Sequence, residues 1–275
     1  MKRFLRFYAL ACLLSWLIWI PLFLPALGIN ITLQIPYNHA LGGLGPLLAA
    51  FIIVFWENGR CGVKSLLKRM TRVRPLKWLA LSFFSPFILL LMAGFLQALF
   101  NDRFLSVGQM FTSKEFPQFS FLLFFLYNLI FFGFGEESGW AGYGVPVLQQ
   151  RFSPLSAAFI FTGFWAIWHL PLFFYRPGYS SMDVTGIIGW TLSLLTGRVL
   201  LSWFQNASHG SIFICAVFHA TIDMAFTSAA TTEQLSVYTG MLVTVWGITM
   251  LIPLQRKRLS KKGKPETDYA IRSPA

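Results

Sequence analysis

Long apolar stretches separated by short polar segments run through the whole chain. A helix needs about 17–25 apolar residues to cross the hydrocarbon core of a membrane. Eight stretches approach this length, at about 7–27, 38–56, 78–100, 121–149, 156–174, 186–204, 211–228 and 236–254. The pattern predicts an all-α, polytopic transmembrane helical bundle of about eight transmembrane helices, built as a single integral membrane domain over residues 1–275.

The composition excludes a soluble protein. Of the 275 residues, 56% are hydrophobic and only 12% are charged, whereas soluble domains carry about 25% charged residues. The ten Trp and thirty Phe residues are expected mostly on lipid-facing surfaces or in interfacial belts, where aromatic side chains collect in membrane proteins.

Basic residues predict the orientation of the chain, since Lys and Arg prefer the cytoplasmic side. Eighteen of the 22 basic residues fall on one predicted side, which comprises the N-terminus, the 57–77 loop, Arg151 and the segment after Leu254. We therefore expect a multi-pass protein of the cell membrane with both termini in the cytoplasm. The net charge of +12 then favours contact with membrane lipid head groups rather than with nucleic acid.

Two basic segments carry more specific expectations. Residues 60–77 are predicted to form a basic interfacial helix. Residues 255–275 contain too little apolar material to pack, so they are predicted to be a disordered basic cytoplasmic tail.

Five acidic and histidine side chains lie inside the apolar stretches of the second half of the chain: Glu136, Glu137, His169, His219 and Asp223. Each has a simple structural interpretation. The glutamates can mark a helix end at the interface, and His169 can bond a backbone carbonyl. His219 and Asp223 stand four residues apart on one helix face and can form a buried pair between helices.

A functional interpretation arises because these groups can meet. At 1.5 Å per residue, Glu136, His169 and His219 lie roughly 22, 20 and 13 Å from the polar ends of their stretches, which are compatible depths. Ionisable groups in membranes usually face a bundle interior or a wet cavity and pair with one another. A carboxylate and two histidines around one polar intramembrane cavity would form a hydrolytic set of a base and an oxyanion donor.

The stretch around the glutamates is rich in small residues. Gly135, Gly139, Gly142 and Gly144 predict close approach of neighbouring helices. Pro146 is expected to loosen this helix and to free backbone groups next to the acidic pair.

Three motifs in this order resemble those of the CPBP family, which contains CAAX-prenyl-protease-2-like and bacteriocin-processing (Abi) intramembrane proteases. They are "EESGWAGYGVPVLQQ", "FWAIWHLPLFF" and "FHATID", set against the family patterns EExxxR, (F/W)xxxH and Hxxx(N/B). The resemblance spans roughly residues 118–228. It implies an intramembrane endopeptidase that hydrolyses a peptide bond near a membrane-associated or lipid-modified C-terminus.

The resemblance also implies roles for individual residues. Glu136 would activate the hydrolytic water, which His169 would share, and Glu137 would support the site. His219 and Asp223 would form the oxyanion hole. Asp223 stands where the family usually has Asn, so we expect it to be protonated or to orient His219.

A second departure concerns Glu137, because Ala141 stands where the family has arginine. Neighbouring residues on a helix point about 100° apart, so the two glutamates cannot face the same water. Glu137 is therefore expected to be neutral, or to pair with a backbone donor or with Arg198. In the neutral case, Glu137→Gln would keep measurable activity, whereas Glu136→Gln would abolish it.

The sequence leaves alternatives open. Glu136, His169 and His219 also have the ligand types of a Zn²⁺ site, although a metal-free mechanism without a cofactor is favoured. Competing functions are a catalytically weak bacteriocin-immunity or interaction protein, and a proton-coupled transporter. The favoured partners are a peptide or lipidated-protein substrate and membrane lipid; no pattern specifies an oligomeric state.

Overall fold

The computed structural model describes residues 1–29, 31–33, 35–101 and 103–259, and this part of the chain contains helices and no strands. The first half contains α1 (Lys2–Phe23), η1 (Leu24–Leu27), α2 (Asn38–Gly42), α3 (Gly45–Met70), α4 (Leu76–Asn101) and η2 (Val107–Phe111). The middle contains α5 (Phe121–Asn128), η3 (Leu129–Phe134), α6 (Gly135–Gly139), η4 (Trp140–Gly144) and α7 (Val145–Gln149). The rest contains α8 (Pro154–Trp168), α9 (Leu172–Tyr175), α10 (Val184–Ala207), α11 (Ile212–Thr227), α12 (Glu233–Thr249) and α13 (Leu251–Leu259).

Within the described residues, six helical segments are long and apolar enough to cross a membrane: Lys2–Leu27, Asn38–Met70, Leu76–Asn101, Phe121–Gln149, Val184–Ala207 and Glu233–Gln255. The apolar helices α8 and α11 are shorter, with 15 and 16 residues. These findings confirm the polytopic helical bundle. All eight predicted stretches contain a helix, but a count of eight complete spans stays a prediction, because α8 ends at Trp168 instead of continuing to residue 174.

Helix α3 changes direction at Gly59, directly before the basic segment 60–77. Gly59 has φ 57° and ψ −151°, a conformation that a residue with a Cβ rarely adopts. The chain continues as a helix to Met70, so the first part of the predicted interfacial helix is helical. The predicted 57–77 loop is correspondingly shorter and consists of the connection between α3 and α4.

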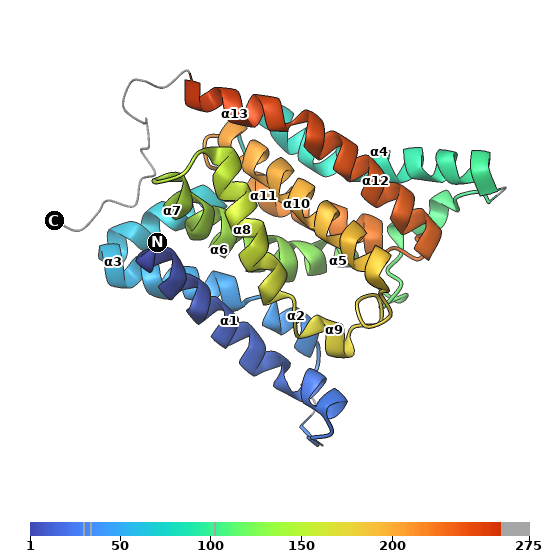
Figure 1. Cartoon of the computed structure of the whole chain (residues 1–275), viewed down its shortest axis with the longest axis horizontal. Coiled ribbons are helices and arrows are strands. Elements are labelled where there is room, and N and C mark those ends of the chain that lie inside the picture. The colour runs from blue at the N-terminus through green and yellow to red at the C-terminus, as the bar shows by residue number, and fades with distance from the viewer. Residues whose placement is uncertain (30, 34, 102, 260–275) are drawn as a thin grey trace.

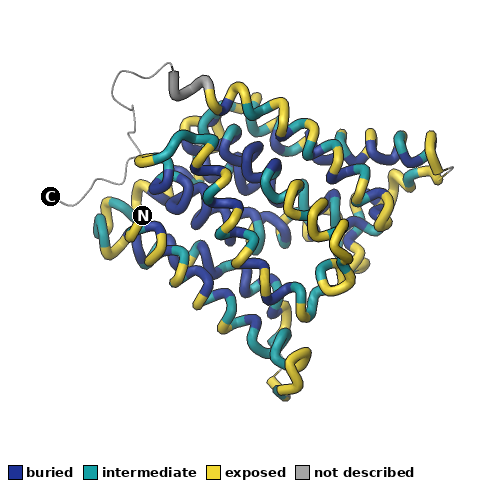
Figure 2. Tube along the Cα trace, in the orientation of Figure 1, coloured by how far each residue is buried: buried dark blue, intermediate teal, exposed yellow. Residues whose placement is uncertain are grey.

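The helix that carries the glutamate pair lies in the middle of the bundle. In Figure 1, α12 and α13 follow one edge of the molecule and α1 the opposite edge, with α6, α8, α10 and α11 between them. Helix α6 packs against α3 on one side and α11 on the other, while α10 contacts α8, α11 and α12. Buried residues accordingly concentrate in the centre, and exposed residues lie along the outer helices (Figure 2).

Glycines allow this central segment to approach its neighbours closely, as the sequence predicted for Gly139 and as Gly133 adds. A Cβ on Gly139 would stand 2.5 Å from the Pro46 carbonyl oxygen in α3. On the other side, a Cβ on Gly133 would stand 2.5 Å from the Ala216 carbonyl oxygen in α11. Both distances are below van der Waals contact with rigid backbone, so larger residues would push the helices apart.

The predicted disordered tail is wrong at its beginning. Helix α13 extends to Leu259, so residues 255–259 are helical. The rest of that predicted tail, residues 260–275, lies outside the described residues.

Candidate active site

The glutamate pair lies on a locally widened helix. The segment Phe121–Gln149 is continuous, but π-helical turns η3 and η4 stand directly before and after α6. Such π-helical turns within an α-helix often occur at functional sites. Both glutamates are buried, so the interpretation of this pair as a solvated helix end at the interface is wrong.

Pro146 explains why backbone oxygens near the pair need partners from elsewhere. Proline has no N–H, so the carbonyl that a residue at this position would normally bind is left free. The buried Arg69 of α3 donates to the Gly142 and Ala141 oxygens, at 2.8 and 2.7 Å, and Gln205 donates to the Ala141 oxygen at 2.7 Å. Side chains from α3 and α10 therefore hold the widened helix in place.

Glu136 has one occupied and one available carboxylate oxygen. Its Oε2 accepts hydrogen bonds from the indole nitrogens of Trp140 and Trp165, both at 3.0 Å. Its Oε1 lies 3.8 Å from Nε2 of His219. Two donors on one oxygen fix the carboxylate and leave Oε1 free to accept a proton.

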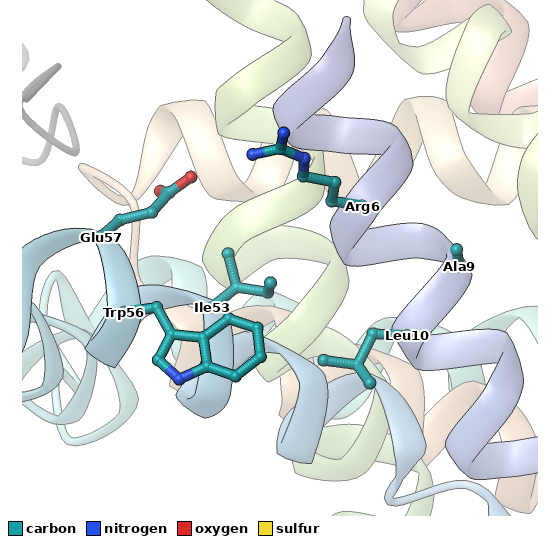
Figure 3. A pocket seen from close by; sticks show the side chains of 6 residues that line it. All are labelled: Arg6, Ala9, Leu10, Ile53, Trp56 and Glu57. Carbon is teal, nitrogen blue, oxygen red and sulfur yellow. The ribbon is translucent and has the colours of Figure 1, made fainter.

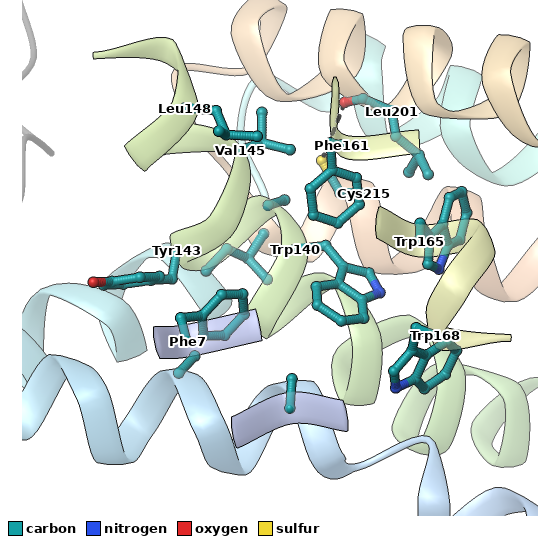
Figure 4. Close-up of a cluster of buried hydrophobic side chains, with 14 of the residues drawn as sticks. Phe7, Trp140, Tyr143, Val145, Leu148, Phe161, Trp165, Trp168, Leu201 and Cys215 are labelled. Atoms are coloured by element: carbon teal, nitrogen blue, oxygen red, sulfur yellow. Dashed lines mark hydrogen bonds between the residues drawn. The ribbon is translucent and has the colours of Figure 1, made fainter. Parts of the chain in front are cut away.

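These two tryptophans are the functional residues that sequence reasoning missed. Trp140 and Trp165 belong to a buried aromatic cluster with Phe161 and Trp168 (Figure 4). The expectation that aromatic residues mostly face lipid or the interface is wrong for this cluster. A signal was present, because Trp140 stands one helical turn after Glu136 and Trp165 occupies the aromatic position of the second motif.

Glu137 faces different partners from Glu136. Nη1 of Arg198 lies 3.3 Å from Oε2 and 3.4 Å from Oε1 of Glu137, and both side chains are completely buried. Nδ1 of His219 lies 3.1 Å from Glu137 Oε1. The expected pairing of Glu137 with Arg198 is confirmed. A guanidinium and an imidazole donor favour the ionised carboxylate over the neutral acid.

His219 connects the three carboxyl groups. Because the ionised Glu137 can only accept, Nδ1 of His219 carries the hydrogen of their hydrogen bond. Nε2 then points toward Glu136 and lies 3.7 Å from Oδ2 of Asp223. The predicted contact between His219 and Asp223, four residues apart, is present, and the Asp223 side chain remains 31% exposed.

His169 approaches this cluster less directly. It follows the last residue of α8, and its Nδ1 lies 2.7 Å from the Trp165 carbonyl oxygen, as its simple structural interpretation predicted. The carbonyl can only accept, so Nδ1–H donates and Nε2 is left as an acceptor. Its ring packs against Trp165, at 5.4 Å between centroids, and Trp165 in turn packs against His219 at 5.9 Å.

The geometry does not provide the zinc site considered above. In the part of the chain that the structure describes, no three His, Cys, Asp or Glu side chains are placed to hold one metal ion together. We therefore derive no chemical step through a metal.

A pocket elsewhere in the molecule contains none of the predicted site residues. It has a volume of about 630 Å³ and lies between α1 and α3, lined by Arg6, Ala9, Leu10, Ile53, Trp56 and Glu57 (Figure 3). Its carboxylate, Glu57, is bound by Arg3 and by the Tyr143 hydroxyl, each at 2.9 Å.

Residues 118–225 match the family described as type II CAAX prenyl endopeptidase Rce1-like. The match supports a protease of the CPBP family. The matched segment contains all five predicted site residues and confirms the resemblance drawn from the three motifs. The chain is also similar to CAAX prenyl protease 2 of Methanococcus maripaludis, with 30% identity over 115 residues. That alignment covers 40% of this chain and 42% of the relative, which is less than half of either protein.

Proposed function

We propose that the protein is an intramembrane endopeptidase that hydrolyses a peptide bond near a membrane-associated or lipid-modified C-terminus. The observation that carries the proposal is the arrangement of Glu136. Its Oε2 is held by two indole donors, while its Oε1 faces Nε2 of His219. A fixed carboxylate beside a histidine suits general-base activation of water.

In the proposed reaction, Glu136 Oε1 takes a proton from a water molecule, and the resulting hydroxide attacks the scissile carbonyl carbon. In this scheme His219 is doubly protonated, because its Nδ1 donates to Glu137 and its Nε2 faces the carboxyl groups of Glu136 and Asp223. Its Nε2–H donates to the oxygen that becomes negative in the tetrahedral intermediate. Glu136 then returns the proton to the leaving amine, and the carbon–nitrogen bond breaks. The protonated form of Glu136 exists only between these two transfers.

His169 and Asp223 have supporting roles in this scheme. The free Nε2 of His169 is assigned to share the hydrolytic water, since Nδ1 is occupied by the Trp165 carbonyl. Asp223 lies against the same nitrogen of His219 that serves the oxyanion. We assign Asp223 to orienting His219, because an ionised carboxylate placed at the oxyanion itself would repel it.

The substrate class rests on the comparison and on the surroundings of the site. The relative is named as a CAAX prenyl protease, and this site lies within an apolar helical bundle. A peptide with a prenylated C-terminus is therefore the first substrate to test.

The bias of basic residues toward one predicted side supports cytoplasmic termini, which can be tested by the accessibility of cysteines introduced before α1 and in the α3–α4 connection.

The testing experiment uses the purified full chain in liposomes, with prenylated and unprenylated versions of the same peptide. Wild type should cleave the prenylated peptide, and Glu136→Gln should abolish cleavage while the protein unfolds at nearly the same temperature. Glu233→Gln, at the start of α12, is the matched control and should cleave like wild type. Equal cleavage by Glu136→Gln and Glu233→Gln would contradict the assignment of the base.

The alternative of a catalytically weak interaction protein drew its support from Ala141, which removes the expected cation near Glu137. Arg198 provides a cation at that carboxylate from another helix, so this argument for inactivity loses its basis. A folded wild-type protein that cleaves no peptide in liposomes would favour the interaction or transport functions instead.

A further inference from the structure

Arg198 is a cation placed where a membrane protein would normally avoid one. It lies in the middle of α10, its side chain is completely buried, and its guanidinium stands 5.4 Å from the Phe161 ring. A charge inside the bilayer region is costly and usually marks a functional pair.

The contacts of Arg198 are directed at a single group. Only Nη1 reaches Glu137, where it lies between the two carboxylate oxygens. Its Nε and Nη2 have no hydrogen-bond partner among the residues that the structure describes. An arginine that served mainly to fasten helices together would use these donors on neighbouring backbone, as Arg69 does.

Glu137 connects Arg198 to His219. Its Oε1 contacts Arg198 and also accepts from Nδ1 of His219. The opposite nitrogen of His219 faces Glu136 Oε1 and Asp223 Oδ2. A continuous series of contacts therefore runs from Arg198 on α10, through Glu137 on α6, to the ring nitrogen that faces the base.

We propose that Arg198 is a positioning residue that keeps Glu137 as an anionic acceptor and thereby holds His219 with Nε2 directed at Glu136. This inference rests on the proposed peptidase function. A carboxyl group buried without a cation becomes protonated more readily. A protonated Glu137 no longer obliges Nδ1 of His219 to carry a hydrogen, so the doubly protonated state of the ring and its orientation both lose their support.

The competing interpretation is a purely structural ion pair. Both interpretations expect Arg198→Met to destabilise the protein, since it leaves a buried carboxylate without its partner. They differ when both charges are removed. A neutral replacement of a buried pair is often tolerated, so Glu137→Gln/Arg198→Met should recover thermal stability, but it cannot restore an anionic acceptor for His219.

The experiment compares wild type, Arg198→Met, Arg198→Lys, Glu137→Gln and the double variant in liposomes, with thermal unfolding, kcat and KM measured for each. We expect Arg198→Met and the double variant to lose about 10- to 100-fold in kcat, by analogy with residues that orient the ligands of metal sites, with little change in KM. Arg198→Lys should exceed Arg198→Met in kcat, because the contact uses one nitrogen. Arg3→Met, which affects an ion pair outside the site, is the control and should keep wild-type kcat.

Recovery of both stability and kcat in the double variant would show a purely structural pair and overturn the proposal. Wild-type kcat in Arg198→Met would do the same. Failure of Arg198→Met to fold leaves the decision to the double variant. The proposed function fails separately, through continued cleavage by Glu136→Gln, so the two inferences are distinguishable.

Discussion

Replacing Arg69 with methionine should destabilise the protein far more than the loss of one surface charge. Arg69 is buried at the end of α3 and joins three parts of the chain. Its guanidinium donates to the Ala141 and Gly142 oxygens in η4 and to the Gly210 oxygen between α10 and α11, at 2.7, 2.8 and 2.9 Å.

The expected loss in the free energy of unfolding depends on which of these oxygens keeps a second hydrogen-bond donor from another side chain. The Ala141 oxygen keeps its hydrogen bond from Gln205. The Gly142 and Gly210 oxygens lose the contact with Arg69, and each buried group left unsatisfied costs about 1–3 kcal/mol. We therefore expect a loss of about 2–6 kcal/mol in the free energy of unfolding, a large part of the about 5–15 kcal/mol that stabilises a typical protein.

The assay is thermal unfolding of the purified protein in detergent, compared with the neighbouring variant Lys68→Met. Lys68 is exposed on the same helix, so its replacement removes the same charge without affecting these oxygens. Arg69→Lys should fall between wild type and Arg69→Met, because one ammonium cannot reach all three carbonyls. Equal unfolding temperatures for Arg69→Met and Lys68→Met would refute the assignment of Arg69 as the link that holds η4.

Further expectations concern the base, the helix packing, a helix cap and metal dependence. Trp165→Phe removes one of the two donors to Glu136. A hydrogen bond to a charged group is worth about 1.5–3 kcal/mol, so kcat should fall about 10- to 100-fold. An unchanged kcat would contradict the assignment of Trp165 as a residue that fixes the base. Gly139→Ala would place a Cβ 2.5 Å from an α3 carbonyl oxygen, whereas a Cβ on Gly163 would meet nothing within 4 Å. Gly139→Ala should therefore lower the unfolding temperature, since overpacking costs about 1–3 kcal/mol, and Gly163→Ala should not lower it. Asp183 accepts from the Gly186 N–H and the Thr185 hydroxyl, and these bonds lower its pKa. The stability from this cap is therefore present above the unfolded-state pKa of about 3.9 and is lost as pH falls through the lower folded-state pKa, so the difference in unfolding temperature between wild type and Asp183→Asn should shrink in acid. Cleavage should persist in a chelator; loss that added zinc reverses would show that a metal is required.

The sequence by itself determined the features that depend on one helix at a time. Apolar length indicated the helical bundle, and the spacing of His219 and Asp223 placed them on one helix face. The glycines before and after Glu136 and Glu137 indicated the close helix contacts that the structure contains. Such patterns are readable because helical periodicity depends only on neighbouring residues in the chain.

The tertiary structure decided which side chains complete the site. Trp165 binds Glu136 across 29 residues, Arg198 binds Glu137 across 61, and Arg69 binds the Ala141 carbonyl across 72. Periodicity shows which face of a helix is polar, but it does not give the rotation and depth at which two helices pack. The sequence offered Arg198 as one of several partners for Glu137, and the choice among them was decided only when α6 and α10 were placed together, because electrostatic pairing depends on distance in space and not on separation along the chain.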